Sequence, residues 1–275
     1  MKQTENFVSG SNKLSCVFTV PNEQEIKAGL IFVHAAEGTR LGPHRMYVEI
    51  AERLKCCGVI SLRFDMRGCG DSEGEPAGSD IDPDIEDLLS AISFMSSKYK
   101  VPKILLFGIS RGARVSITTL AEHGLPIDGA VLLSTPFASS MVAAKNFTNR
   151  LKEYLYKLFN YTYLKKLLLG KANPKQIVRT MIFALSSTRR YRRNHDGFKT
   201  TCPLLFIYGS KDPLATDSSS YYENICNMYK IRFKMIEIKN SNHSYFHYRW
   251  KEQIMNITEQ WLNENILGDI DGSML

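Results

Sequence analysis

The 275-residue sequence lacks the features that would mark a secreted, metal-binding or membrane-spanning protein. Its opening segment, Met1–Lys13, is polar, so no signal peptide is expected there, and no apolar run approaches the length of a membrane span. The six cysteines include no C-x-x-C pair, so neither a zinc site nor a disulfide framework is expected. Free thiols in a reducing cytoplasm are the expectation, and the predicted localisation is cytoplasmic.

Positive charge is concentrated in one part of the chain. Between Met141 and Thr200 there are 14 Lys and Arg residues against Glu153 and Asp196, a local charge of +12, whereas the whole chain carries +7 and the remainder therefore −5. This basic segment is suited to an anionic membrane surface or an acidic carrier protein. It contains no recognisable nucleic-acid-binding motif, so a nucleic acid is not an expected partner.

Apolar runs alternate with helical periodicity along most of the chain, which predicts βαβ units and a mostly parallel sheet. The expected strands are residues 6–9, 13–20, 29–34, 59–64, 103–109, 129–134, 203–208 and 232–238. The expected helices are residues 44–57, 82–98, 113–123, 218–228 and 250–266. The alternation stops at residue 138 and resumes near residue 199, with only helical periodicity between. We therefore predict an α/β core formed by residues 1–137 and 199–275, with a helical lid at residues 138–198.

One stretch carries a catalytic signature. Gly108-Ile109-Ser110-Arg111-Gly112 is a G-x-S-x-G motif, preceded by an apolar strand and followed by a helix that ends near Gly124. A strand, a tight turn with serine at its tip and a helix are the context that this nucleophile motif requires. The small flanking residues let the strand and the helix pack closely against the turn. Ser110 is therefore the predicted nucleophile.

A nucleophilic serine needs a base and a carboxylate that orients the base. In open parallel sheets such residues lie in loops beyond the C-terminal ends of the strands. His243 follows the last predicted strand and Asp212 the strand before it, so both qualify. The order Ser110, Asp212, His243 is the order of α/β-hydrolases. Two alternatives remain: His247 in place of His243, and Asp217 in place of Asp212.

The chain resembles the α/β-hydrolases over nearly its whole length, with a helical lid inserted after the sixth strand. Within this superfamily it is similar to the serine-aminopeptidase-like hydrolases, and Arg40–Arg45 (RLGPHR) and Arg63–Gly74 (RFDMRGCGDSEG) also resemble the exosortase-system-associated hydrolases. The resemblance implies an oxyanion hole formed by the backbone N–H groups of Arg111 and of Ala35 or Ala36. Many relatives carry His-Gly where this chain has His34-Ala35, which leaves the second donor open.

Residues near the predicted oxyanion loop are candidates for substrate binding: His34, Arg40, His44 and Arg45. The last three are potentially cationic and suit a carboxylate or phosphate remote from the scissile bond. Alternatively, His34 orients the oxyanion loop, and His44 and Arg45 are solvated residues that open a helix. We expect a further set to fix the loop after its strand by turn hydrogen bonds and an ion pair: Asp65, Arg67, Asp71 and Ser72.

The expected function is a serine hydrolase that acts on a carboxylic ester or thioester, with an apolar acyl group as its small-molecule substrate. The mechanism requires no metal and no organic cofactor. A serine peptidase or amidase and an acyltransferase would use the same three residues, so both stay open. A non-catalytic binding protein on the same fold is a further alternative, which the complete set of candidate residues disfavours.

Overall fold

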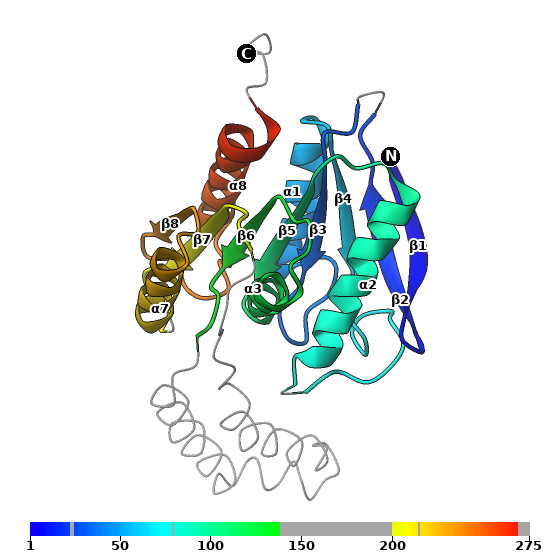
Figure 1. The fold of residues 1–275 in the computed structure, drawn as a ribbon, viewed down its shortest axis with the longest axis horizontal. Helices are drawn as coiled ribbons and strands as arrows, with labels where there is room; N and C mark the ends of the chain where they lie inside the picture. The colour runs from blue at the N-terminus through cyan, green and yellow to red at the C-terminus, as the bar shows by residue number, and fades with distance from the viewer. Residues whose placement is uncertain (23–24, 79, 138–199, 214, 269–275) are drawn as a thin grey trace, which may run out of the picture. The chain divides into compact units, whose positions relative to one another are not determined.

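The central feature of the structure is a single eight-stranded sheet (Figure 1). The computed structural model describes residues 1–22, 25–78, 80–137, 200–213 and 215–268. The strands are β1 (Lys2–Ser9), β2 (Asn12–Thr19), β3 (Ala28–Val33), β4 (Val59–Phe64), β5 (Ile104–Ile109), β6 (Gly129–Leu133), β7 (Leu204–Gly209) and β8 (Phe233–Ile238). Their order across the sheet is β1-β2-β4-β3-β5-β6-β7-β8. The β1–β2 and β2–β4 pairs are antiparallel and all the others are parallel.

Helices cover both faces of the sheet, as predicted for an α/β-hydrolase fold (Figure 1). The helices are α1 (Met46–Lys55), α2 (Asp82–Lys98), α3 (Arg111–His123), α7 (Ala215–Met228) and α8 (Tyr248–Leu262), with a 3-10 turn at Pro43–Arg45 and a π turn at Asn263–Leu267. Apolar side chains of α2, α3 and α7 form one core with the sheet, and those of α1 and α8 form a second core on the other face. Because both faces are covered, every residue of the strands β3, β4, β5, β6 and β7 is buried. The predicted lid, residues 138–198, lies outside the described residues.

Four helices begin at positions other than the sequence indicated. The helices α3 and α7 begin two and three residues earlier than predicted, at Arg111 and Ala215. The helix expected from His44 starts at Met46, because His44 (φ 49°) and Arg45 (φ 62°) adopt the left-handed conformation, through which a right-handed helix cannot extend. The helix expected from Trp250 starts at Tyr248, because the ring of His247 accepts a hydrogen bond from the backbone N–H of Arg249 and caps the first turn.

The strand order reverses between β3 and β5, and this reversal positions the site. From β3 the chain crosses to β4 on one side and later to β5 on the other. Val33, the last residue of β3, pairs with Gly108 of β5. The loops that leave these two strands must therefore diverge from neighbouring points at the same edge of the sheet. In open α/β sheets this is where ligands bind.

The first turn of α3 lies directly against the end of β3. A Cβ atom on Gly112 would overlap the carbonyl group of Val33 and lie 2.6 Å from the carbonyl oxygen of His34. All these atoms belong to backbone, which cannot rotate away as a side chain can. Glycine at this position therefore permits α3 to pack closely on the end of β3. The packing that the motif implied, between β5 and α3, depends on Gly108, where a Cβ atom would lie 2.6 Å from the backbone of Ala113.

Gly112→Ala should destabilise the fold by about 2–3 kcal/mol or more, because overpacking against backbone has no inexpensive relaxation. The matched control is Gly29→Ala in β3, where the added Cβ meets the flexible end of the Met95 side chain. Urea unfolding should give a clearly lower midpoint for the Gly112 variant than for the control. Equal midpoints would mean that the helix can withdraw from the strand without cost.

Candidate active site

Ser110 occupies a strained turn between β5 and α3. Its backbone angles are φ 54° and ψ −117°, a conformation that residues other than glycine rarely adopt. Its N–H donates to Leu133 O of β6 at 2.8 Å, and its carbonyl accepts from Arg114 N inside α3 at 3.0 Å. The turn is thus fixed from both sides, and its side chain stands at the N-terminus of a helix, where the helix dipole favours negative charge.

Three of the predicted residues meet at this edge of the sheet. His243 Nε2 lies 2.9 Å from Ser110 Oγ, and His243 Nδ1 lies 2.8 Å from Asp212 Oδ2. The Asp212 side chain is fully buried, whereas 32% of the His243 side chain is exposed. A buried carboxylate on Nδ1 requires the proton of a neutral imidazole to lie there, which leaves Nε2 as an acceptor for the serine proton. The arrangement has the geometry of a nucleophile, a base and an orienting carboxylate.

The two rival residues lie elsewhere. His247 is exposed and caps α8, and Asp217 is an exposed residue in the first turn of α7. Neither makes a hydrogen bond to Ser110 or His243 within the described part of the chain. The geometry therefore favours His243 over His247 and Asp212 over Asp217.

The loop that carries His243 is held by a buried pair that sequence reasoning missed. Ser134, at the end of β6, lies 2.8 Å from the hydroxyl of Tyr245 and 3.3 Å from the carbonyl oxygen of His243. The Tyr245 hydroxyl also donates to Ile207 O of β7 at 2.9 Å. Burial raises the pKa of Tyr245, so this hydroxyl keeps its proton and remains a donor. In the sequence, the one signal that Tyr245 holds this loop is its position two residues after the candidate base.

His34 holds the loop after β3, where the oxyanion donors are predicted. Its Nε2 accepts from Met66 N at 2.9 Å, and its Nδ1 lies 2.7 Å from Ala35 O. Acceptance at Nε2 assigns the proton to Nδ1, which donates to Ala35. Burial lowers the pKa of His34 and outweighs the opposing effects of the Ala35 carbonyl and Asp65, so the ring is neutral. Both ring nitrogens have backbone partners, which favours the orienting alternative over contact with substrate.

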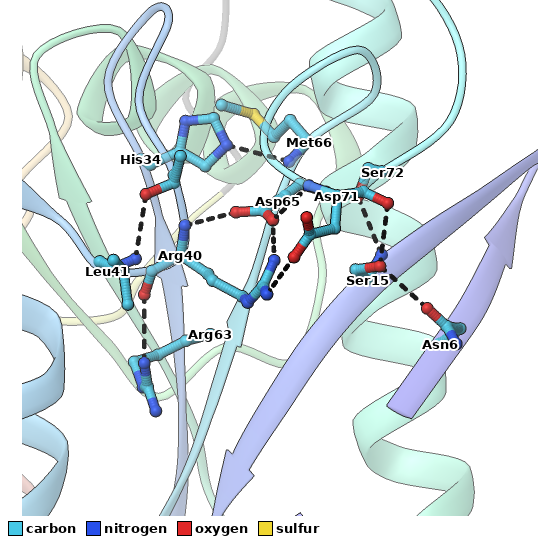
Figure 2. A network of polar contacts seen from close by, with 11 residues as sticks. Asn6, Ser15, His34, Arg40, Leu41, Arg63, Asp65, Met66, Asp71 and Ser72 are labelled. Carbon is cyan, nitrogen blue, oxygen red and sulfur yellow. Dashed lines mark hydrogen bonds and ion pairs between the residues drawn. The ribbon is translucent and has the colours of Figure 1, made fainter. Parts of the chain in front are cut away.

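A buried carboxylate joins this loop to the loop after β4 (Figure 2). Asp65 accepts from Arg40 N at 2.6 Å and from Asp71 N at 3.1 Å, and it forms an ion pair with the Arg40 guanidinium. Its carbonyl oxygen accepts from the Ser72 hydroxyl at 2.6 Å. Gly70 (φ 52°) allows the loop to close around this group, since a Cβ there would overlap the carboxylate. Turn hydrogen bonds of Asp65, Asp71 and Ser72 fix this loop, as the sequence predicted. The ion pair joins these carboxylates to Arg40 and not to Arg67, which pairs with Glu86 and Asp87 of α2.

The three cationic substrate-binding candidates divide between two environments. The guanidinium of Arg40 pairs with Asp65 and Asp71 (Figure 2). Burial opposes its charge, but hydrogen bonding to Asp71 and the attraction of both carboxylates outweigh burial and raise the pKa of Arg40. Arg40 is therefore engaged in the loop network, and its contact with substrate stays a prediction. His44 and Arg45 are both exposed.

The predicted oxyanion donors lie on either side of the β3–β5 junction. Arg111 is the first residue of α3, where helical N–H groups lack partners within the helix. Its side chain donates from Nε to the buried carboxylate of Asp84 on α2 at 2.5 Å. Burial raises the pKa of Asp84, and Arg111 opposes this rise. Across the junction, Gly38 N donates to Ala35 O at 3.0 Å and closes a tight turn around Ala36.

Fold and site geometry together define an α/β-hydrolase. The structure superposes on the esterase Pf2001 of Pyrococcus furiosus with a TM-score of 0.72 at 19% identity, covering 97% of this chain and 92% of that one. It also superposes on Est1E of Butyrivibrio proteoclasticus, solved with ferulic acid, with a TM-score of 0.68 at 20% identity, covering 96% of this chain and 100% of that one. At this level of sequence identity, the two superpositions show that the fold is shared.

The chain belongs to the family described as serine aminopeptidase, S33, whose sequence profile matches residues 24–181. It is 26% identical over 216 residues to human protein ABHD12B, covering 75% of this chain and 53% of that protein. It is also 26% identical over 215 residues to the monoglyceride lipase of Rattus norvegicus, covering 70% and 68%. The chain thus spans between about half and two thirds of the length of these relatives. The predicted superfamily and the serine-aminopeptidase-like branch are confirmed.

Asp65→Asn should destabilise the fold by about 3 kcal/mol, because it leaves a half-buried guanidinium beside a neutral amide. The matched control is Asp71→Asn, which removes the other carboxylate from the same guanidinium. The Asp71 side chain is 71% exposed, against 0% for Asp65, so the control should lose about 1 kcal/mol or less. Chemical unfolding of the two variants would compare them. A control as unstable as the Asp65 variant would contradict the view that burial of Asp65 matters most.

Proposed function

We propose that the protein is a serine hydrolase that cleaves a carboxylic ester or thioester with an apolar acyl group. The observation that carries this proposal is the continuous hydrogen-bonded path from Ser110 Oγ through the His243 ring to Asp212. Membership of a serine hydrolase family supports it, as do the names of relatives, which include monoglyceride lipase and lysophosphatidylserine lipase. A non-catalytic binding protein would have no need of this alignment.

In the first step Ser110 Oγ attacks the acyl carbonyl carbon while its proton passes to His243 Nε2. Asp212 holds the Nδ1 proton and stabilises the imidazolium that forms. The carbonyl oxygen becomes an oxyanion, which the N–H of Arg111 and an N–H of the Ala35–Ala36 segment stabilise. The helix N-terminus adds to this stabilisation. The imidazolium then protonates the leaving alcohol or thiol, and an acyl-enzyme remains.

In the second step water replaces the leaving group. His243 removes a proton from the water as its oxygen attacks the acyl carbon, and Ser110 regains its proton as the acid departs. An alcohol, amine or thiol in place of water would give acyl transfer by the same residues. The three residues do not discriminate between these acceptors, so the transferase stays an alternative to be tested with added nucleophiles.

The preference for an apolar acyl group rests on the pattern of residues 138–198. In this segment large apolar side chains recur at helical spacing: Phe147, Leu151, Tyr154, Leu155, Leu158 and Tyr161. The segment lies outside the described residues, so its contact with substrate stays a prediction. The same holds for its predicted partners, an anionic membrane or an acidic carrier protein. The lipase relatives independently favour an acyl ester as the small-molecule substrate.

A second candidate is a serine aminopeptidase. The observation that favours it is the description of the matched family. An aminopeptidase must bind a free substrate ammonium beside the scissile bond. Amino-acyl amides with a free amine therefore belong in any substrate panel, with their N-acetylated forms for comparison.

Ser110→Ala should abolish labelling by a fluorophosphonate and lower kcat by about 10⁶-fold. His243→Ala should be nearly as damaging, and Asp212→Asn should lower kcat by about 10⁴-fold because it favours the wrong imidazole tautomer. Wild-type activity should fall at acid pH, where a histidine base is protonated. Single-turnover kinetics on a p-nitrophenyl ester would supply the rates.

The matched controls are the rival residues, His247→Ala and Asp217→Asn, which should keep kcat within a few-fold of wild type. If His247→Ala were inactive and His243→Ala active, the base would be wrongly assigned. Labelling that persists in Ser110→Ala would overturn the nucleophile.

Along a series of p-nitrophenyl esters, kcat/KM should rise about tenfold for each two added carbons, from acetyl to about octanoyl, as burial of each methylene contributes about 0.8 kcal/mol. Deleting residues 143–193 should flatten this rise if the apolar segment contacts the acyl chain. A preference for acetyl esters would exclude an extended acyl site. A preference for amino-acyl amides with a free amine would establish the aminopeptidase instead.

A further inference from the structure

Exposed apolar side chains gather at the edge of the sheet that carries the candidate site. Six large apolar side chains are exposed in the described part of the chain. Three of them lie on the loops after β3 and β8 or at the start of α8: Leu41 (43% exposed), Phe246 (56%) and Tyr248 (65%). Phe246 follows the candidate base His243 by three residues. The other three are Met1 and Val8, on β1 or beside it, and Met228, at the far end of α7.

The aromatic residues form a connected group rather than isolated exposed rings. Phe246 and Trp250 meet edge to face with ring centroids 5.3 Å apart, and the His247 ring lies 5.3 Å from Trp250. His247 also stacks on Tyr248 at 4.9 Å. This arrangement keeps the rings at the surface in fixed orientations. Tyrosine and tryptophan are the side chains that favour a membrane–water interface, since one end of each is apolar and the other polar.

Basic residues flank these rings. Arg249 lies 5.8 Å from the centroid of Tyr248 and donates to its hydroxyl, and Lys251 Nζ lies 3.5 Å from His44 O, which joins the loop after β3 to the start of α8. Arg45 and Arg249 are exposed, and neither pairs with a carboxylate among the described residues.

Most of the nearby carboxylates are paired with basic residues, which leaves the guanidinium groups of Arg45 and Arg249 against one exposed carboxylate on the loop after β3. Glu49 is paired with Lys251 and Glu252 with Arg53, so Glu37 is the remaining exposed carboxylate on the loop after β3. Arg45 and its neighbour His44 both have left-handed backbone conformations, which few residues adopt without a constraint. Apolar rings with unpaired guanidinium groups beside them match the two layers of a lipid surface, acyl chains and phosphates.

We propose that the aromatic rim, defined as Leu41, His44, Arg45, Phe246, Tyr248 and Arg249, docks on an anionic phospholipid bilayer and brings the candidate site to substrates held there. The rings enter the interface while the guanidinium groups contact lipid phosphates. The choice of substrate rests on the proposed function, whereas the docking itself does not. A soluble protein partner would bury the same rings without requiring lipid phosphate.

Flotation of the full-length Ser110→Ala protein with vesicles tests docking without any hydrolysis. Vesicles of phosphatidylcholine with about 30% phosphatidylserine should bind the protein more tightly than phosphatidylcholine alone, and added salt should weaken binding. Phe246→Ser with Tyr248→Ser should reduce binding at least tenfold. The double variant Arg45→Gln, Arg249→Gln should bind the anionic vesicles more weakly, by about fivefold for each arginine, and should bind the phosphatidylcholine vesicles as wild type does. The matched control, Val8→Ser with Met228→Ser, removes equally exposed apolar groups elsewhere and should bind as wild type.

A second measurement needs no change in the rim itself. Brominated lipids should quench the fluorescence of Trp250, and Trp250→Phe should remove that quenching, since Trp261 is only 2% exposed. The proposal is overturned if the rim variants bind anionic vesicles as tightly as the control, or if bound protein shows no quenching. Loss of esterase activity in every assay, with binding intact, would instead refute the proposed function alone.

In the active enzyme, the ratio of turnover on a vesicle-borne ester to turnover on a water-soluble ester should fall at least tenfold in the Phe246 and Tyr248 variant. This ratio separates docking from any effect on the chemistry, because a damaged site lowers both rates together. An unchanged ratio would mean that the substrate does not reach the site from the bilayer.

Discussion

The close approach of α3 to the end of β3 is the constraint on which the site depends. With no Cβ on Gly112, the helix packs on the carbonyl groups of Val33 and His34. This contact sets the separation between the serine turn and the loop after β3, which supply the proposed nucleophile and the proposed oxyanion donors. A catalytic site must hold such groups to within a fraction of an ångström. A contact between two backbone segments holds this separation firmly, because backbone atoms cannot rotate away as a side chain can.

Buried polar groups then fix each loop beyond the sheet. His34 connects the loop after β3 to Met66, Asp65 connects it to Asp71, and Tyr245 connects the loop of His243 to β6 and β7. Each of these groups is largely or fully buried and has its partners, so moving any loop would leave a donor or acceptor unsatisfied. The donors are therefore held in place before a substrate arrives, which is the condition for electrostatic stabilisation of a transition state.

The same edge of the sheet carries the proposed chemistry and the aromatic rim. The loop of nine residues between β8 and α8 holds both His243 and Phe246, so a surface that docked there would lie near the proposed nucleophile. Among the described residues no helix is long and apolar enough to span a membrane. Docking of the kind proposed here depends on side chains at a rim and not on a spanning helix.

The sequence by itself determined the fold class and selected Ser110, Asp212 and His243 as candidate catalytic residues, with His247 and Asp217 as alternatives. Strand and helix periodicity indicate the type and order of the elements, and the G-x-S-x-G turn has one structural context, so Ser110, Asp212 and His243 could be selected from their order and their places after strands. The choice of His243 over His247 needed the structure, since both follow β8 and only their distances to Ser110 Oγ separate them.

Tertiary structure alone decided the environment of each residue. Arg40, His44 and Arg45 are all potentially cationic residues of one short segment, yet Arg40 lies against a buried carboxylate while the other two are exposed. The sequence does not reveal this difference, because the carboxylate belongs to Asp65, which is 25 residues away along the chain. Ser134 and Tyr245 are 111 residues apart, and no local pattern signals their contact. Periodicity reports neighbours within an element, whereas ion pairs and buried hydrogen bonds between loops depend on how distant elements pack.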